Sequence, residues 1–372
     1  MGTFLLWAPF PEGQLLFESS FPGLPETLAK AASAARAELR GHCKAHLEDE
    51  EKARSKESTE SFVASARRYA DLCKRVHGAF SERPLEVAVW DAGSPAIART
   101  FQWRVAVFGG GADDVPEKTR GEVSILYNDP SFLFERTCAL LALAAALQRH
   151  AQTLAKDGQG EGQEPPQCAP LREAAGALTR LRGQVLPLFR ATHGEGRVSH
   201  VFSSDFVGAL QCAVTGQLFV CKARPLLRTQ HAASAWLLFR AAQLFEKACA
   251  AMPCVGALRV SRLRASAFAY AAVGEAVLQD AGEAGVSEAC MDRAERAVRG
   301  EDDCASLHAV FAKRLDKAHQ QNKFVFGCMR VPEEGELVVR CEEQRNDGGQ
   351  GSVAVTRDER GVVTVALRGG GK

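Results

Sequence analysis

The chain has 372 residues, of which 46% are hydrophobic and 24% are charged, and its 46 Lys and Arg residues balance 45 Asp and Glu residues. This composition is that of a globular protein with enough apolar side chains for a large core. The formal net charge of +1 excludes a polyanion-binding surface over the whole molecule, because such a surface needs an excess of Lys and Arg. We therefore expect no nucleic-acid partner.

The apolar segments and the cysteines both indicate a cytoplasmic protein. The longest uninterrupted apolar run, Cys138 to Leu147, has roughly half the length that a helix needs to cross a bilayer. The start of the chain lacks the basic region and small-residue cleavage site of a secretory signal. The 12 cysteines include no CxxC pair, and several fall in apolar helical patterns, where a free thiol acts as a small hydrophobic group. We expect reduced thiols and no membrane span.

The first third of the chain combines helices with a small β region. Residues 26–56 and 58–78 carry apolar residues at helical spacing and charged residues on their other faces, which predicts two helices. Residues 85–90 and 99–108 alternate apolar and polar side chains and are rich in β-branched and aromatic types. Because the turn-forming stretch 91–95 lies between them, we predict a β-hairpin at about 85–108.

The rest of the chain is predominantly helical. From about residue 130 to 325, apolar residues recur at helical spacing in segments separated by Gly and Pro clusters. One segment, residues 171–188, should kink or end at Pro187 because proline has no N–H donor. The remaining residues, 338–372, are predicted as a tail, in which the alternation from Val353 to Leu367 indicates a small hairpin or a disordered end.

Motifs for catalysis or cofactor binding are missing from the sequence. The glycines at 109–111 follow a predicted strand, but no phosphate-binding phasing accompanies them and Asp113 and Asp114 would repel a phosphate. His42, Cys43 and His46 share one helical face and are possible zinc ligands, yet the sequence places no further ligand beside them. A solvated helix face is the favoured interpretation of these three residues. We expect no catalytic residues, no cofactor and no metal.

One helical segment has apolar residues on two opposite faces. Its core stripe is formed by Ala235, Leu238, Ala242, Phe245 and Cys249, whereas the opposite side presents Ala233, Trp236, Leu237 and Leu244 around Arg240. In the preceding helix, Phe219 also lies off the core stripe. Either neighbouring helices bury both faces, which is the commoner outcome in a large helical core, or the second face is displayed to a partner helix.

Three separated stretches are informative together: Ser131–Leu147, Thr100–Arg104, and Asn322–Phe326 with Arg330-Val331-Pro332. They resemble the Bro domain family, which includes Alix and rhophilin. The stretch SFLFERTCALLALAAAL, from Ser131 to Leu147, resembles the "FE+xCVLFNLAAL" helix of that family. Thr100 to Arg104 is similar to its "FxW" strand, and Asn322 to Phe326 with Arg330-Val331-Pro332 is similar to its "NDFIY…RVP" closing segment. Because order and spacing agree, the resemblance covers about residues 1–337 and places a Bro-type domain there.

The resemblance implies a fold and a non-enzymatic function. The fold would be mainly α, an elongated, boomerang-shaped, tetratricopeptide-like helical array with a small N-terminal β-sheet. Its members bind the C-terminal amphipathic helix of an ESCRT-III subunit, of the charged multivesicular body protein type, on an apolar concave patch. Matching the family's patch helices to Gln217–Ala223 and Ala241–Phe245 puts the patch residues at Phe219, Ala233 and Leu237.

These positions coincide with the off-stripe residues identified by periodicity. At one of them, Ala233, the side chain is smaller than the family's residue. An Ile-type anchor becomes Ala233, which removes buried area worth roughly 2 kcal/mol. Trp236, beside Leu237, is able to replace that area, and Arg224, Arg228 and Arg240 are available to acidic residues of a ligand. The predicted partner-binding residues are Phe219, Ala233, Trp236, Leu237 and Arg240.

The sequence therefore predicts a cytoplasmic adaptor that docks an ESCRT-III helix in endosomal sorting, multivesicular body formation or membrane remodelling. It would be recruited to endosomal membranes only indirectly, through its partners. Two alternatives stay open: a helical scaffold that binds a small GTPase or another signalling peptide, and a cysteine- or metal-dependent enzyme.

Overall fold

The computed structural model describes residues 10–12, 16–17, 24–48, 55–81, 101–107, 123–129, 132–155, 164–193, 202–253, 255–327, 329–333, 335–342, 352–359 and 361–368. Its α-helices are α2 (Glu26–Glu48), α3 (Lys56–Ser81), α5 (Phe132–Leu154), α6 (Cys168–Arg180), α7 (Leu186–His193), α8 (Ser204–Leu226), α9 (His231–Ala251), α10 (Gly256–Ala281), α11 (Ala284–Arg296) and α12 (Ala305–Phe324). Its strands are β1 (Phe10–Glu12), β2 (Phe101–Val107), β3 (Val123–Asp129), β4 (Leu337–Glu342), β5 (Ser352–Arg357) and β6 (Val363–Arg368).

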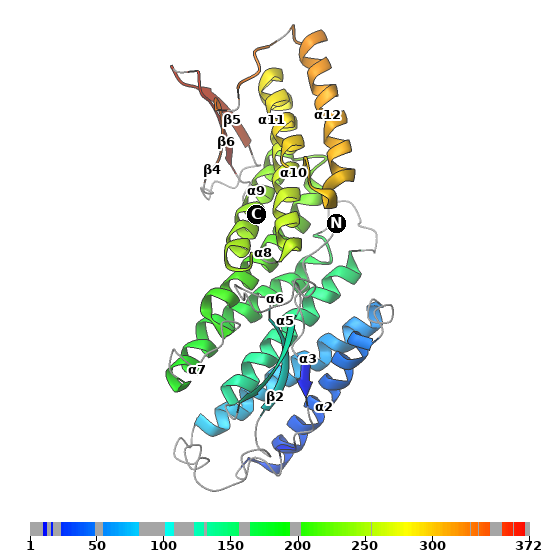
Figure 1. Cartoon of the computed structure of the whole chain (residues 1–372), viewed down its shortest axis with the longest axis vertical. Helices are drawn as coiled ribbons and strands as arrows, with labels where there is room; N and C mark the ends of the chain where they lie inside the picture. The colour runs from blue at the N-terminus through cyan, green and yellow to red at the C-terminus, as the bar shows by residue number, and fades with distance from the viewer. Residues whose placement is uncertain are drawn as a thin grey trace.

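The helices form an elongated array in which neighbours in the chain are mostly neighbours in space. Helix α2 packs on α3, α3 on α5, α5 on α6, α6 on α8, and α8 through α12 each pack on the next. Figure 1 shows this progression from α2 and α3 at one end of the molecule to α11 and α12 at the other. Such stacking gives each helix two apolar faces, one for each neighbour. The predicted fold class, a mainly α elongated array with a small N-terminal sheet, is confirmed.

The N-terminal sheet is antiparallel with β2 in the middle. Phe10 of β1 pairs with Arg104, and Phe101 of β2 pairs with Asp129 of β3. The predicted strand 99–108 thus exists as β2, but its two described partners are β1 and β3. Residues 85–95, the other arm and turn of the predicted hairpin, lie outside the described residues.

A buried polar cluster ties this sheet to the helices. Glu135 of α5, fully buried, accepts a hydrogen bond from Arg36 Nε of α2 at 2.9 Å and further bonds from the Tyr69 hydroxyl of α3 and Trp103 Nε1 of β2. Burial lowers the pKa of Arg36, but its interactions with Glu135, Tyr69 and Cys73 together raise it above the usual value, so the guanidinium stays charged. Arg36 also reaches the carbonyl of Glu12 in β1 at 3.4 Å. Four elements distant in sequence therefore meet at one carboxylate.

Helix α6 continues into α7 through a π-helical segment, Leu181–Val185. Pro187 lies just beyond this segment. In a regular α-helix its ring would collide with the carbonyl of Gly183, and proline has no N–H to donate to that carbonyl. A wider π turn relieves that collision without ending the helix. The predicted disturbance at Pro187 is therefore a local widening.

The C-terminal strands form a second sheet, which packs on the helices. Strand β6 lies between β4, to which it is parallel, and β5, to which it is antiparallel. One face of this sheet is apolar and packs on parts of α9, α10 and α11. Figure 1 shows the sheet beside these helices. Its buried side chains are Leu337, Val363, Val365 and Leu367. The strands predicted within the tail thus belong to the folded helical unit.

Two features hold the closing segment after α12 against α11: hydrogen bonds from Asn322 and a close backbone contact at Gly285. Asn322 Nδ2 donates to Glu288 Oε2 at 2.7 Å and to the carbonyl oxygen of Met329 at 2.9 Å. Gly285 of α11 lies so close to this segment that a Cβ there would be 2.1 Å from the carbonyl oxygen of Arg330. The closing segment is therefore fitted against a bare backbone surface of α11.

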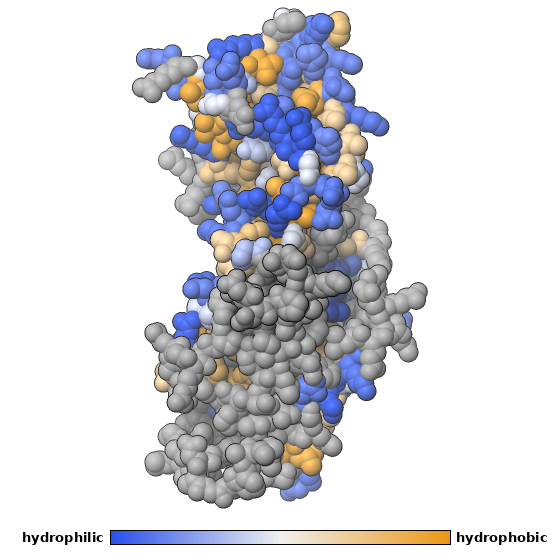
Figure 2. Space-filling model, viewed as in Figure 1, coloured by the Kyte–Doolittle hydropathy of each residue, from blue (hydrophilic) through white to orange (hydrophobic). Residues whose placement is uncertain are grey.

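Among the described residues, only α8 is long and apolar enough to cross a membrane, with a mean hydropathy of 1.3 over its best window, and 61% of that window is buried in the protein. Its neighbours α6 and α9 provide that burial. On the face shown in Figure 2, apolar residues occur in small groups between hydrophilic ones. The burial of most of the apolar window of α8 is typical of a core helix in a folded domain.

Candidate partner-binding face

Helices α8 and α9 carry the residues that the sequence singled out. The Ser203 side chain caps α8 by accepting a hydrogen bond from the backbone N–H of Phe206 at 3.0 Å. Gly216 of α8 allows the two helices to approach closely, since a Cβ at this position would lie 3.0 Å from the ring of Phe245 in α9. Close packing brings the outward side chains of the two helices within contact distance of each other.

Phe219, Trp236, Leu237 and Arg240 form what we call the α8–α9 face. The ring centroids of Phe219 and Trp236 are 6.4 Å apart, with the rings tilted by 57°. The Arg240 guanidinium lies over the Trp236 ring, 5.5 Å from its centroid, and Arg240 Nη1 donates to Gln243 Oε1 at 3.3 Å. The structure thus brings together one aromatic from each helix and a cation.

All four residues of the α8–α9 face are half-buried, so the face is neither sealed nor fully open. Phe219 rests against the main core, and Leu237 packs on a small cluster formed by Ala223, Leu238 and Ala269. Ala233, predicted as the fifth binding residue, is only 9% exposed. It offers a partner almost no surface, because its methyl group does not project beyond the packed helices.

The C-terminal sheet borders the face on the Trp236 side. Trp236 packs against the apolar cluster that includes Val363 and Val365 of β6. Burial raises the pKa of Cys341 in β4 to about 11, and the neighbouring Arg240 acts in the opposite direction. Trp236 therefore has a structural role that the sequence did not predict, as an apolar contact for the sheet. Local periodicity gave no signal for it, because β4 and β6 associate across a long connection.

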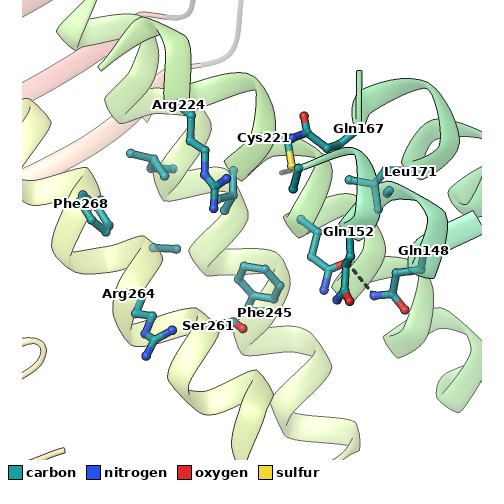
Figure 3. A pocket seen from close by; sticks show the side chains of 16 residues that line it. Gln148, Gln152, Gln167, Leu171, Cys221, Arg224, Phe245, Ser261, Arg264 and Phe268 are labelled. Carbon is teal, nitrogen blue, oxygen red and sulfur yellow. Dashed lines mark hydrogen bonds between the residues drawn. The ribbon is translucent and has the colours of Figure 1, made fainter. Parts of the chain in front are cut away.

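The surroundings of the face are basic. Residues 206–245 contain no Asp or Glu, and Lys222, Arg228 and Arg240 lie in this range. Arg224, five residues after Phe219, lies on the opposite side of α8, where it lines a separate pocket (Figure 3), and does not belong to these surroundings. Lys222 is partly balanced by Glu164, at 3.7 Å, and Arg228 is exposed. Leu226, which the sequence did not single out, lies seven residues after Phe219 and therefore on the same side of α8, where it is half-buried. The seven-residue spacing was its only sequence signal.

The possible zinc site on α2 is not completed by further ligands among the described residues. These residues contain no group of three or more His, Cys, Asp or Glu side chains placed to hold a metal. Burial raises the pKa of Cys43 to about 12, and the His42 ring stacks on Phe62 at 6.3 Å. The side chain of His46 and the glycines at 109–111 lie outside the described residues. The Cys43 thiol therefore stays protonated at neutral pH, which makes it a poor ligand and nucleophile.

Comparison with solved structures decides the fold. The chain aligns with the Bro1 domain of ALIX in its complex with CHMP4C, with a TM-score of 0.60 and 16% identity over 90% of this chain and 92% of that one. The chain has the Bro1-domain fold. ALIX bound to the SIVmac239 PYKEVTEDL late domain gives a TM-score of 0.57 and 17% identity, over 90% of this chain and 47% of that longer one.

A third Bro1 domain structure, described as the basis for endosomal targeting, gives a TM-score of 0.54 and 14% identity over 89% of this chain and 88% of that one. No family model and no curated protein matches the sequence. Each of the three stretches that resemble the Bro domain contributes a residue to a tertiary contact of this fold. Glu135 and Trp103 meet in the buried polar cluster, and Asn322 fastens the closing segment.

Proposed function

We propose that this protein is a non-enzymatic adaptor whose α8–α9 face binds an acidic amphipathic helix, that of an ESCRT-III subunit of the charged multivesicular body type. Through this partner it would be recruited from the cytoplasm to endosomal membranes. The observation that carries the proposal is the half-exposed pair Phe219 and Trp236 with Arg240 over it. Trp and Arg are among the residues most enriched at the energetic centres of protein interfaces, and an amphipathic helix binds by laying its apolar face on apolar side chains.

Two further observations support this partner. The four half-buried residues supply apolar contact area, and the basic surroundings complement an acidic helix and favour its encounter. ALIX, whose Bro1 domain shares the fold over 90% of this chain, is bound to CHMP4C in its structure. The reduced anchor at Ala233 implies that Trp236 contributes a larger share of the contact here.

The test is a titration of the protein into a fluorescently labelled peptide of the CHMP4C C-terminal helix, followed by anisotropy. Leu237→Asp should weaken binding at least about 30-fold, because it places a carboxylate in the apolar contact and repels an acidic peptide. Arg240→Glu should weaken binding about tenfold and leave the fold intact, since Arg240 is half-exposed and makes no ion pair with a described residue.

Two matched controls separate the α8–α9 face from general effects. Val310→Asp changes an exposed aliphatic residue of α12, and Arg314→Glu reverses an arginine that lies over the Phe311 ring at 5.9 Å. Both should bind the peptide like the wild type. Binding that survives Leu237→Asp and Arg240→Glu would reject the face, and a wild type that does not bind would favour a small GTPase or another signalling peptide as the partner.

A further inference from the structure

The C-terminal end of α12 exposes a cluster of large apolar side chains. Phe324 and Val325 are 76% and 71% exposed, and Phe326 and Met329 are also exposed. We call these four residues the α12 tip. Figure 1 shows that the end of α12 reaches the top of the molecule, at one extreme of its long axis. Soluble proteins rarely leave so many neighbouring apolar side chains in water, so such a cluster marks a contact surface.

The backbone holds the α12 tip in place. The N–H groups of Val325 and Phe326 both donate to the carbonyl oxygen of Gln321, at 2.9 and 3.2 Å. Gly327 follows with a φ of +71°, in the left-handed region that favours glycine, and the chain then returns to α11. A Cβ at Gly327 would meet nothing within 4 Å, so the turn is open. Because the hydrogen bond from Asn322 to the Met329 carbonyl fastens the return, the exposed turn is part of the fold.

Positive charge adjoins the α12 tip. Residues 317–332 include lysine and arginine but no Asp or Glu. Lys317 and Lys313 precede Phe324 by seven and eleven residues, so both lie on its side of α12, where both are exposed. The Lys323 ammonium lies over the Phe324 ring, 5.4 Å from its centroid. Apolar side chains flanked by long cationic ones suit the boundary between hydrocarbon and anionic headgroups.

Neighbouring carboxylates do not cancel this charge. Glu288 Oε2 accepts a hydrogen bond from Asn322 Nδ2 at 2.7 Å, and Glu336 pairs with Arg330 at 2.6 Å. Asp316 and Glu333 line the groove between α11, α12 and the closing segment. The exposed side of α12 that carries Lys313 and Lys317 therefore complements an anionic surface.

The shape of the α12 tip favours a membrane over a protein partner. Peptide segments bind in grooves or along strand edges, where matching pockets receive alternate side chains. At the α12 tip, by contrast, Phe324, Val325 and Phe326 are consecutive residues of a projecting turn. A bilayer needs no matching pocket to take up such side chains, and its anionic headgroups meet the lysines beside them.

We propose that the α12 tip binds anionic phospholipid membranes directly. Phe324 and Val325 enter the headgroup region of the bilayer, and the side of α12 with Lys313 and Lys317 lies along the headgroups. This contact adds to recruitment through a protein partner, which was the only route that the sequence predicted. No residue of the α8–α9 face takes part, so the two proposals are tested independently.

Sedimentation of the full chain with vesicles tests the lipid requirement. The vesicles are phosphatidylcholine alone or phosphatidylcholine with about 30 mol% phosphatidylserine. The protein should partition into the phosphatidylserine vesicles at least about tenfold more strongly, and added salt should weaken this binding by screening. Leu237→Asp should bind them like the wild type, because the vesicles carry no protein. Equal partitioning, or no binding, would overturn the proposal and leave the α12 tip to a protein partner.

A pair of serine variants tests the apolar contact. Phe324→Ser should weaken binding to phosphatidylserine vesicles at least about tenfold, because the phenyl ring no longer leaves water. Leu188→Ser changes an exposed leucine of α7 and should leave binding unchanged. Circular dichroism melts of both variants verify folding. Unchanged vesicle binding by a folded Phe324→Ser protein would place the contact elsewhere and contradict the proposal.

Charge neutralisation tests the lysines beside the α12 tip. Lys313→Gln combined with Lys317→Gln should weaken vesicle binding about tenfold or more, since each lysine close to an anionic surface contributes a factor of roughly five. Lys74→Gln combined with Lys247→Gln removes the same charge from exposed positions on α3 and α9 and should have little effect. An equal loss in both double variants would attribute binding to net charge, against the proposed site.

Discussion

Replacing Glu135 by Gln should lower the free energy of unfolding by about 3–5 kcal/mol, as expected when one partner of a buried ion pair is removed. The Arg36 and Glu135 side chains are only 3% and 0% exposed, so water cannot solvate the guanidinium that loses its counter-charge. The Tyr69 hydroxyl and Trp103 Nε1 also donate to this carboxylate and would compete for one amide oxygen. Urea denaturation followed by circular dichroism measures the change.

The matched control is Glu173→Gln. Glu173 of α6 accepts two hydrogen bonds from Arg67 of α3, at 2.9 and 2.8 Å, so it has the same partner type as Glu135. Its pair is 48% and 36% exposed, and such surface pairs contribute about 1 kcal/mol or less. If the two variants lose the same small amount of stability, burial of the Glu135 cluster does not matter and the cluster is not what joins the sheet to the helices.

The sequence could predict the helices because their signals are local. Apolar spacing located the elements now seen as α2, α3, α8 and α9. Associations between distant segments carry no such local signal. The parallel pairing of β4 with β6 connects residues 337–342 to 363–368, and its packing on α9 depends on the tertiary arrangement. A period-2 pattern predicts strands but not the face that they cover.

The same distinction applies to the candidate sites. Periodicity identified Trp236 and Leu237 as off the core stripe, and both are half-buried as an outward stripe on a packed helix should be. It could not reveal that a sheet borders Trp236 or that Ala233 is too short to project.

Replacing Gly285 by Ala should lower the free energy of unfolding by about 3 kcal/mol, the upper end of the usual range for overpacking. The added methyl group would lie 2.1 Å from the carbonyl oxygen of Arg330 and 3.1 Å from that of Met329. Backbone atoms cannot rotate away as a side chain does, so the closing segment must move as a unit. That movement also breaks the bond from Asn322 to Met329, and hydrogen exchange should increase in α11 and at residues 329–333.

The same substitution at Gly176 should have the opposite sign. Gly176 is exposed in the interior of α6, and a Cβ there would meet nothing within 4 Å. Ala in such a position stabilises a helix by roughly 0.5–1 kcal/mol, because it loses less backbone entropy than Gly on folding. Gly176→Ala should therefore raise the urea midpoint and Gly285→Ala should lower it. A midpoint that rises for both variants would show that α11 and the closing segment are not in close contact, and the tight fit at Gly285 would be wrong.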